Sequence, residues 1–145
     1  MGQEEIYSDQ YLNKILNENK TIASVGVSLN PIRPSYFVSR YLSRRGYAII
    51  PVNPAYAGQI VWGNLAHSQI SEIIQDIDMV QIFRKSEAVP KIVEDAIIHL
   101  PNLKTIWMQI GVMHADAAKT AREHDLEVIQ NLCPKMEHQL SLIHI

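Results

Sequence analysis

The sequence contains very little cysteine, and its charges are close to balanced. Cys133 is the one cysteine among 145 residues, so a disulfide within the chain is excluded, and with it a disulfide-stabilised secreted domain. The formal net charge is −2, which argues against the basic surface that binds nucleic acid. We therefore expect a cytoplasmic protein that does not bind nucleic acid.

Long apolar runs and metal-binding motifs are also missing. No segment approaches the length that spans a bilayer, and residues 1–20 are too polar for a signal peptide, so no membrane association is expected. The six histidines are scattered, without an H-E-x-x-H motif or a cysteine pair, so no metal site is predicted. No two carboxylates can be placed in one pocket, so no catalytic acid–base pair is identified.

What the sequence does contain is a regular alternation of strand-like and helix-like segments. Apolar residues make up 47% of the chain, enough for the core of one globular domain. The alternation predicts an α/β fold with a doubly wound, mainly parallel five-stranded sheet. We expect one domain over residues 1–145, with its core at 20–140, a leading helix at 8–19 and a loose C-terminal end. The predicted strands begin near Ile22, Tyr47, Asp78, Thr105 and Glu127.

Residues 22–36 predict a buried strand, a loop and the start of a helix. Gly26 lets the backbone turn or lets another group approach it closely, because it has no Cβ. Pro34 suits the first position of a helix, where its missing N–H would have no partner. Unpaired backbone N–H groups and the positive end of the helix dipole meet at such a junction, and Arg33 adds a positive charge. We predict that a phosphate-bearing ligand binds here.

Other candidate residues follow the later strands. In an open α/β sheet, the ligand crevice lies beyond the carboxyl ends of the strands, where the strand order reverses. This rule selects the segments that follow the first four predicted strands. The predicted site residues are Gly26, Val27, Ser28, Asn30, Pro31, Arg33, Pro34, Ser35, Val52, Asn53, Pro54, Phe83, Arg84, Gln109 and Gly111.

Structural roles remain open for several of these residues. Gly26 could serve only a tight turn, and Asn53, between two prolines, suits a turn as well as a ligand contact. Arg33 could be a solvated loop charge, and Arg84 could pair with Glu87. Outside the site, Cys133 is predicted to be a buried, inert thiol.

Three further expectations concern secondary structure and surface. Ser86 is predicted to cap the helix that follows it. Pro90 falls in the first turn of that helix, so the regular part is expected to start nearer this proline. Residues 58–71 are predicted to form an irregular connection, with a short helix around 69–75. The arginines at positions 40, 44 and 45 are predicted to form a solvated helix face.

The sequence argues against two common nucleotide sites. A nicotinamide dinucleotide site needs G-x-G-x-x-G at the first turn and an acidic residue about 20 positions later. Only Gly26 is present in that turn, and the second predicted strand ends in Val52-Asn53-Pro54, without a carboxylate. The Gly-Lys-Ser/Thr ending of a Walker phosphate loop is absent as well.

Several sequence blocks occur together in a recognisable order. They are Ser24-Val25-Gly26-Val27-Ser28, Arg33-Pro34-Ser35-Tyr36, Tyr41-Leu42, Gly46-Tyr47, Pro51-Val52-Asn53-Pro54, Phe83-Arg84-Lys85-Ser86-Glu87, Trp107-Met108-Gln109-Ile110-Gly111 and Cys133-Pro134-Lys135-Met136-Glu137-His138. With these blocks the sequence resembles the small, single-domain coenzyme A-binding proteins, a family related to the nucleotide-binding domain of the succinyl-CoA synthetase α subunit. The resemblance implies a Rossmann-like domain in which the turn at 26–35 receives the phosphates. It also implies that 52–54 and 83–84 line the path of adenosine and pantetheine.

The expected function is therefore non-covalent binding of coenzyme A (CoA) or an acyl-CoA. The phosphohistidine of the synthetase lies in a second domain, for which this chain has no room, so no catalytic residue is carried over. Two alternatives stay open: an enzyme, either a reductase or an acyl-transfer enzyme, using the same crevice, and a regulatory or interaction module that responds to CoA. Whether the chain forms a homo-oligomer or binds a protein partner is also open.

Overall fold

The structure is a computed structural model that describes residues 5–143. The α-helices are α1 (Asp9–Glu18), α2 (Pro34–Ser43), α3 (Val89–His99), α4 (Ala115–Glu123) and α5 (Pro134–Ile143). The strands of the main sheet are β1 (Thr21–Val25), β2 (Ala48–Val52), β5 (Met79–Ile82), β6 (Thr105–Met108) and β7 (Glu127–Ile129). Two short strands, β3 (Ile60–Val61) and β4 (Asn64–Leu65), pair separately as an antiparallel hairpin.

The main sheet is parallel throughout and has the order β2-β1-β5-β6-β7. The chain moves outward from β1 to β2, and then returns to the other side of β1 to add β5, β6 and β7. The strand order therefore reverses between β1 and β5, as in the flavodoxin-like form of the doubly wound fold. Val25 pairs with Val52 on one side and Ile82 on the other, so these three strands end level with one another. The predicted fold class is confirmed.

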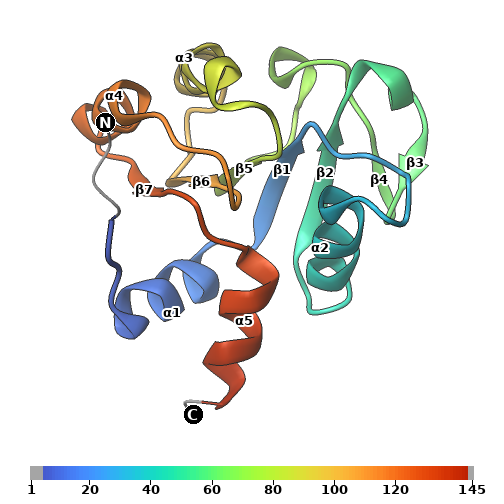
Figure 1. The fold of residues 1–145 in the computed structure, drawn as a ribbon. Coiled ribbons are helices and arrows are strands. Elements are labelled where there is room, and N and C mark those ends of the chain that lie inside the picture. The colour runs from blue at the N-terminus through green and yellow to red at the C-terminus, as the bar shows by residue number, and fades with distance from the viewer. Residues whose placement is uncertain (1–4, 144–145) are drawn as a thin grey trace.

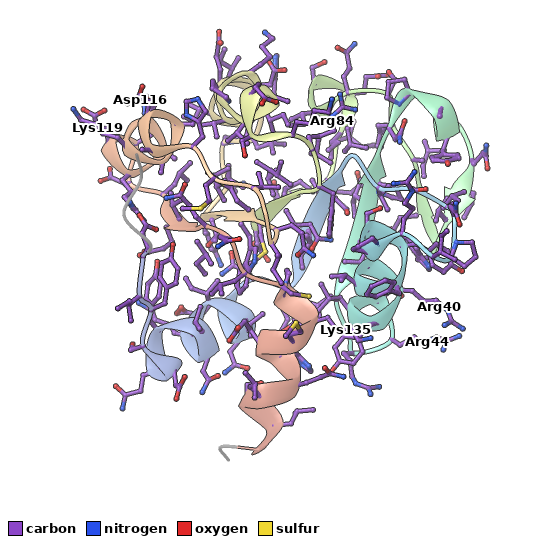
Figure 2. The ribbon with its side chains drawn as sticks, in the orientation of Figure 1. Arg40, Arg44, Arg84, Asp116, Lys119 and Lys135 are labelled. Carbon is purple, nitrogen blue, oxygen red and sulfur yellow. The ribbon has the colours of Figure 1, made fainter. Side chains whose placement is uncertain are left out.

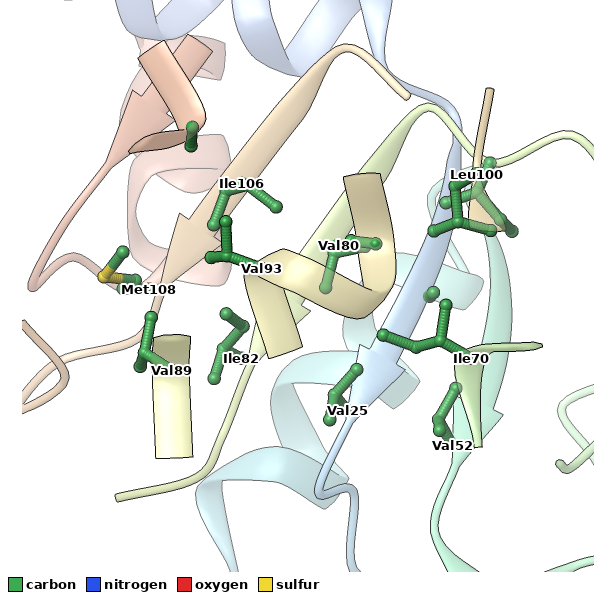
Figure 3. Packing of buried hydrophobic residues seen from close by; sticks show 14 of the residues in the cluster. Val25, Val52, Ile70, Val80, Ile82, Val89, Val93, Leu100, Ile106 and Met108 are labelled. Carbon is green, nitrogen blue, oxygen red and sulfur yellow. The ribbon is translucent and has the colours of Figure 1, made fainter. Parts of the chain in front are cut away.

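Helices cover both faces of the sheet (Figure 1). Side chains alternate along each strand, so Ala23 and Val25 pack in the cluster under α3 and α4, whereas Ile22 packs in the cluster with α1 and α2. Figure 3 shows Val89 and Val93 of α3 packed over strand residues of the first cluster. Burial on both faces explains why the strands read as nearly continuous apolar runs.

A buried polar cluster lies where α2 crosses the sheet. Gln81 of β5 is 1% exposed, and its Nε2 donates hydrogen bonds to Ser24 Oγ at 3.0 Å and Ser39 Oγ at 3.2 Å. The two serine hydroxyls are also 3.1 Å apart. The cluster therefore ties α2 to both strands at the point where the sheet order reverses.

The start of α1 agrees with its prediction, but the predicted cap of α3 was wrong. Ser8 caps α1 by accepting a hydrogen bond from the Tyr11 N–H at 3.1 Å. Ser86 does not cap α3: Ala88 occupies that position, and the Ser86 hydroxyl accepts from the Met113 N–H at 3.0 Å instead.

Residues 58–71 are more regular than the sequence predicts. They contain the β3–β4 hairpin, and the helix expected at 69–75 is only a 3₁₀ turn at Ile70–Glu72. Trp62 and Gly63 form the hairpin turn with φ angles of 50° and 82°, the left-handed pair that matches the twist of the strands. Among the described residues, no helix is long and apolar enough to cross a membrane.

Candidate functional site

Gly26, directly after β1, brings the two sides of the crevice into contact. Its φ is +85°, a left-handed conformation that glycine adopts without steric cost. A Cβ at this position would lie 2.7 Å from Arg84 Cδ and 2.9 Å from the carbonyl oxygen of Phe83. Gly26 is therefore required for its conformation and for the close approach of the residues that follow β5. The tight-turn role that the sequence left open for Gly26 is present, and the close contact with residues 83 and 84 is present as well.

The loop between β1 and α2 is held by its own polar groups. The Ser28 N–H donates to Ser35 Oγ at 2.8 Å, and Ser28 Oγ accepts from the Asn30 N–H at 3.0 Å. The Leu29 N–H points to the Tyr56 hydroxyl at 3.3 Å. These contacts fix the shape of the loop, and they engage the N–H of Ser28, one of the predicted site residues, with a protein acceptor.

Asn53 supports the same loop from the end of β2. Its Nδ2 donates to the Val27 carbonyl at 2.8 Å, and its Oδ1 accepts from the Ala55 N–H at 2.9 Å. Both ends of the amide are thus bonded to backbone. The turn role that the sequence left open for Asn53 is present, and it also positions the loop of the candidate site.

Two N–H groups of this loop remain without an acceptor. Within residues 5–143, those of Val27 and Ser35 donate to no protein group. Ser35 lies in the first turn of α2, which Pro34 begins, and Arg33 precedes it as the N-cap residue. The Arg33 side chain caps no amide of the helix. A helix N-terminus with an unpaired N–H and a guanidinium beside it attracts an anion.

Two cavities meet at this corner. The larger has a volume of about 730 Å³, and the smaller about 280 Å³. Both are lined by Gly26 and Arg84, so these two residues belong to the wall that the cavities share. The larger cavity is lined by Gly26, Ser28, Arg33, Pro34, Ser35, Phe37, Phe83, Arg84, Gln109, Ile110, Val112, Cys133, Lys135, Met136 and Gln139.

Most of the predicted site residues line one cavity or the other. Val52, Asn53 and Pro54 lie in the smaller cavity, on the β2 side of Arg84. The predicted residues that line neither cavity are Val27, Asn30, Pro31 and Gly111. Val27 is fully buried, and the Gly111 N–H donates to Asn131 Oδ1 at 2.7 Å.

The sequence reasoning missed one side of the larger cavity. The residues it did not place there are Phe37, Ile110, Val112, Cys133, Lys135, Met136 and Gln139. Three of these lie in α5, and Cys133 directly precedes it. This helix packs beside α2: the Tyr41 hydroxyl lies 2.8 Å from His138 Nδ1. A signal existed, since the block beginning at Cys133 carries part of the family resemblance. Local sequence does not show that α5 returns to the first crossover.

Gln109, at the end of β6, is a buried polar residue in this cavity. The residue is only 9% exposed, and its Oε1 has no hydrogen-bond partner among the described residues. Such a group costs free energy unless a bound molecule or water satisfies it. The neighbouring Arg84 does not form the ion pair with Glu87 that the spacing allowed: the salt bridges of the described residues lie elsewhere. The Arg84 charge is therefore not neutralised by a protein carboxylate.

Comparison with known proteins identifies the family to which this geometry belongs. The sequence model described as the CoA binding domain matches residues 20–139. The chain belongs to the CoA-binding domain family. Among the described residues of this CoA-binding domain, no group of three or more histidine, cysteine, aspartate or glutamate side chains is placed to hold a metal ion.

Relatives of this CoA-binding domain match it along nearly their whole length. The protein YneT of Bacillus subtilis (strain 168) is 35% identical over 130 residues, covering 90% of this chain and 93% of YneT. A structure from Pyrococcus horikoshii OT3 is 32% identical with a TM-score of 0.87, covering 98% of this chain and 99% of the other. One from Thermus thermophilus is 29% identical with a TM-score of 0.86, covering 93% and 99% respectively.

Proposed function

We propose that this domain binds CoA or an acyl-CoA non-covalently, with the pyrophosphate at the corner where the two cavities meet. The observation that carries the proposal is the start of α2. The unpaired Ser35 N–H and the free Arg33 side chain lie there, at the reversal of the strand order. Arg84 supplies a second guanidinium on the opposite side of Gly26. Two positive charges and a helix dipole suit two adjacent phosphates.

The two cavities match the two arms of the coenzyme. CoA carries adenosine on one side of its pyrophosphate and the long pantetheine chain on the other. We place adenosine in the smaller cavity, beside Asn53 and Pro54, and pantetheine in the larger one. Gln109 supports this assignment, because its unpaired amide oxygen could accept a hydrogen bond from a pantetheine amide.

The residues around the larger cavity favour binding over catalysis. Among residues 5–143, its lining includes no aspartate, glutamate or histidine, so this part of the chain offers it no carboxylate or imidazole to act as a general base. Cys133 is 5% exposed and belongs to the apolar cluster with α1 and α2, as expected for a structural thiol. We therefore infer that the domain holds its ligand without transforming it.

A single substitution tests the phosphate site. Arg33→Ala should weaken CoA binding by about 10-fold or more, because a hydrogen bond to a charged group contributes about 1.5–3 kcal/mol. Arg33 is exposed, so the melting temperature should change little. Isothermal titration calorimetry measures the affinity, and differential scanning fluorimetry measures the stability. Lys119→Ala, on the exposed side of α4 far from the site, is the matched control (Figure 2).

Two results would contradict the proposal. Equal CoA affinity in Arg33→Ala and the wild type would remove Arg33 from the site. Stronger binding of NAD than of CoA by the wild type would contradict the coenzyme assignment itself. Native mass spectrometry of the purified protein gives an independent check, and CoA or an acyl-CoA is the retained ligand we expect.

A further inference from the structure

A small basic hollow lies between α2 and α5, next to the larger cavity. It has a volume of about 220 Å³. Figure 2 shows Arg40, Arg44 and Lys135 on the same side of the molecule. The hollow is lined by Phe37, Arg40, Tyr41, Arg44, Arg45 and Lys135.

The four cations of the hollow have no carboxylate partner in residues 5–143. The salt bridges of that part of the chain use Lys91, Lys104 and Arg122 instead. Aromatic rings hold two of the cations: Arg45 Cζ lies 4.8 Å from the centre of the Tyr41 ring, and Lys135 Nζ lies 5.2 Å from that of Phe37. The overall charge of the chain is −2, so this local excess does not follow from composition.

The pKa of a nearby histidine also reflects this positive environment. His138 of α5 bonds to the Tyr41 hydroxyl, and burial lowers the pKa of its imidazole. The charges of Lys20 and Arg45 lower that pKa further. Because the imidazole tends to stay neutral, the hollow attracts an anion mainly through its arginines and lysine.

The hollow continues the larger cavity. Phe37 and Lys135 line both of them. Along α2, Arg40 and Arg44 lie six and ten residues beyond Pro34, which corresponds to about 9 and 15 Å from the phosphate corner at 1.5 Å per residue. An extended pantetheine arm is longer than these distances, so the end of an acyl chain lies at these arginines when the arm folds back within the larger cavity, whose wall the hollow shares.

We propose that the hollow receives the terminal carboxylate of an acyl group, so that the preferred ligand is an ω-carboxyacyl-CoA. The inference rests on the proposed function and specifies its ligand. Arginine side chains bind carboxylates through paired, charge-assisted hydrogen bonds. The other anion of the coenzyme, the 3′-phosphate, belongs to the adenosine arm, which we place across Arg84 in the smaller cavity.

The test compares thioesters that differ only at the end of the acyl chain. Calorimetry would measure malonyl-, glutaryl- and adipyl-CoA against propionyl-, valeryl- and hexanoyl-CoA, so that three chain lengths are covered. We expect a carboxylate to tighten binding by about 10-fold at the length that fits. Arg40→Gln/Arg44→Gln should lose this preference and keep the affinity for valeryl-CoA. Lys119→Gln should keep both.

Three possible results distinguish a failure of this inference from a failure of the proposed function. If the wild type binds CoA but prefers no carboxylate at any length, this inference is wrong and the proposed function stands. If Arg40→Gln/Arg44→Gln weakens CoA but not dephospho-CoA, the hollow binds the 3′-phosphate, which also overturns the inference. If the wild type binds no CoA at all, the proposed function fails and this inference fails with it. Circular dichroism of each variant confirms that it is folded.

Discussion

Gly26 shows how much one residue can determine in this fold. It combines a left-handed backbone with a contact that leaves no room for a Cβ, whereas Gly46, at the end of α2, has φ +90° and no atom within 4 Å of the position of a Cβ. The two glycines thus share a conformational requirement and differ in crowding. This difference allows the two contributions to be measured separately.

We predict that Gly46→Ala lowers the free energy of unfolding by about 1 kcal/mol, the cost of a left-handed alanine. Gly26→Ala should cost about 3 kcal/mol, because its Cβ must also displace Phe83 or Arg84. Urea denaturation measures both values. Only Gly26→Ala should weaken CoA binding as well. Equal losses of stability in the two variants would show that the contact with residues 83 and 84 is unimportant.

At the scale of the element, α2 depends on its buried polar contact with the sheet. Ser39 is fully buried. Its hydroxyl hydrogen-bonds to the Ser24 hydroxyl and accepts a hydrogen bond from the Gln81 amide. The same helix carries Arg33 at its start and Arg40 further along, on either side of that contact. The orientation of the proposed phosphate site and of the basic hollow relative to the sheet therefore depends on the same three polar side chains.

Ser39→Ala should lower the free energy of unfolding by about 1–2 kcal/mol, since it leaves the Gln81 amide with one partner fewer in the core. Gln81→Met should cost less, because it also removes the unpaired Oε1. Combining both changes should cost less than the sum, as expected for residues in contact. A double-mutant cycle from urea melts measures the coupling. Strict additivity would mean that the three side chains do not act as a unit.

At the scale of the whole molecule, the segment before α1 is tied to the far end of the sheet. Arg122 of α4 donates to both carboxylate oxygens of Glu5, at 2.8 and 3.0 Å. The Tyr7 hydroxyl donates to Glu5 and accepts from the Gln130 N–H at 2.8 Å. The hydrogen bond from Arg122 is the main cause that lowers the pKa of Glu5 from 4.5 to about 2.

This pKa shift predicts how stability depends on pH. A carboxylate whose pKa is lower in the folded state stabilises the fold above its unfolded pKa and loses that effect as pH falls through the folded value. The stability difference between the wild type and Glu5→Gln should therefore be constant above about pH 5 and shrink between pH 4.5 and 2. Thermal melts across this range test it.

The sequence predicted the sheet well because each strand carries its own signal. Buried parallel strands are short apolar runs, and the residues after them can be assigned to one edge from the order of elements alone. This argument is the reason why Arg84 was predicted to belong to the site. The start of α2 at Pro34 was also predicted from local sequence, because proline favours the first position of a helix.

The missed features depend on contacts between distant segments. Lys135 lines both the large cavity and the basic hollow only because α5 packs against α2, which lies about a hundred positions earlier in the chain. The β3–β4 hairpin was missed for a different reason. Its turn is Trp62-Gly63, and tryptophan is not a residue that predicts a left-handed turn.

The reversal of the strand order has a consequence for how the protein is made. Ile22 of β1 pairs with Ile49 on one side and with Met79 on the other. While the ribosome is still translating the middle of the chain, one side of the crevice exists and the other has not been synthesised. If CoA binds at the proposed site, it stabilises the nascent protein only after β5 and the arginine that follows it have emerged, and earlier folding proceeds without help from the ligand.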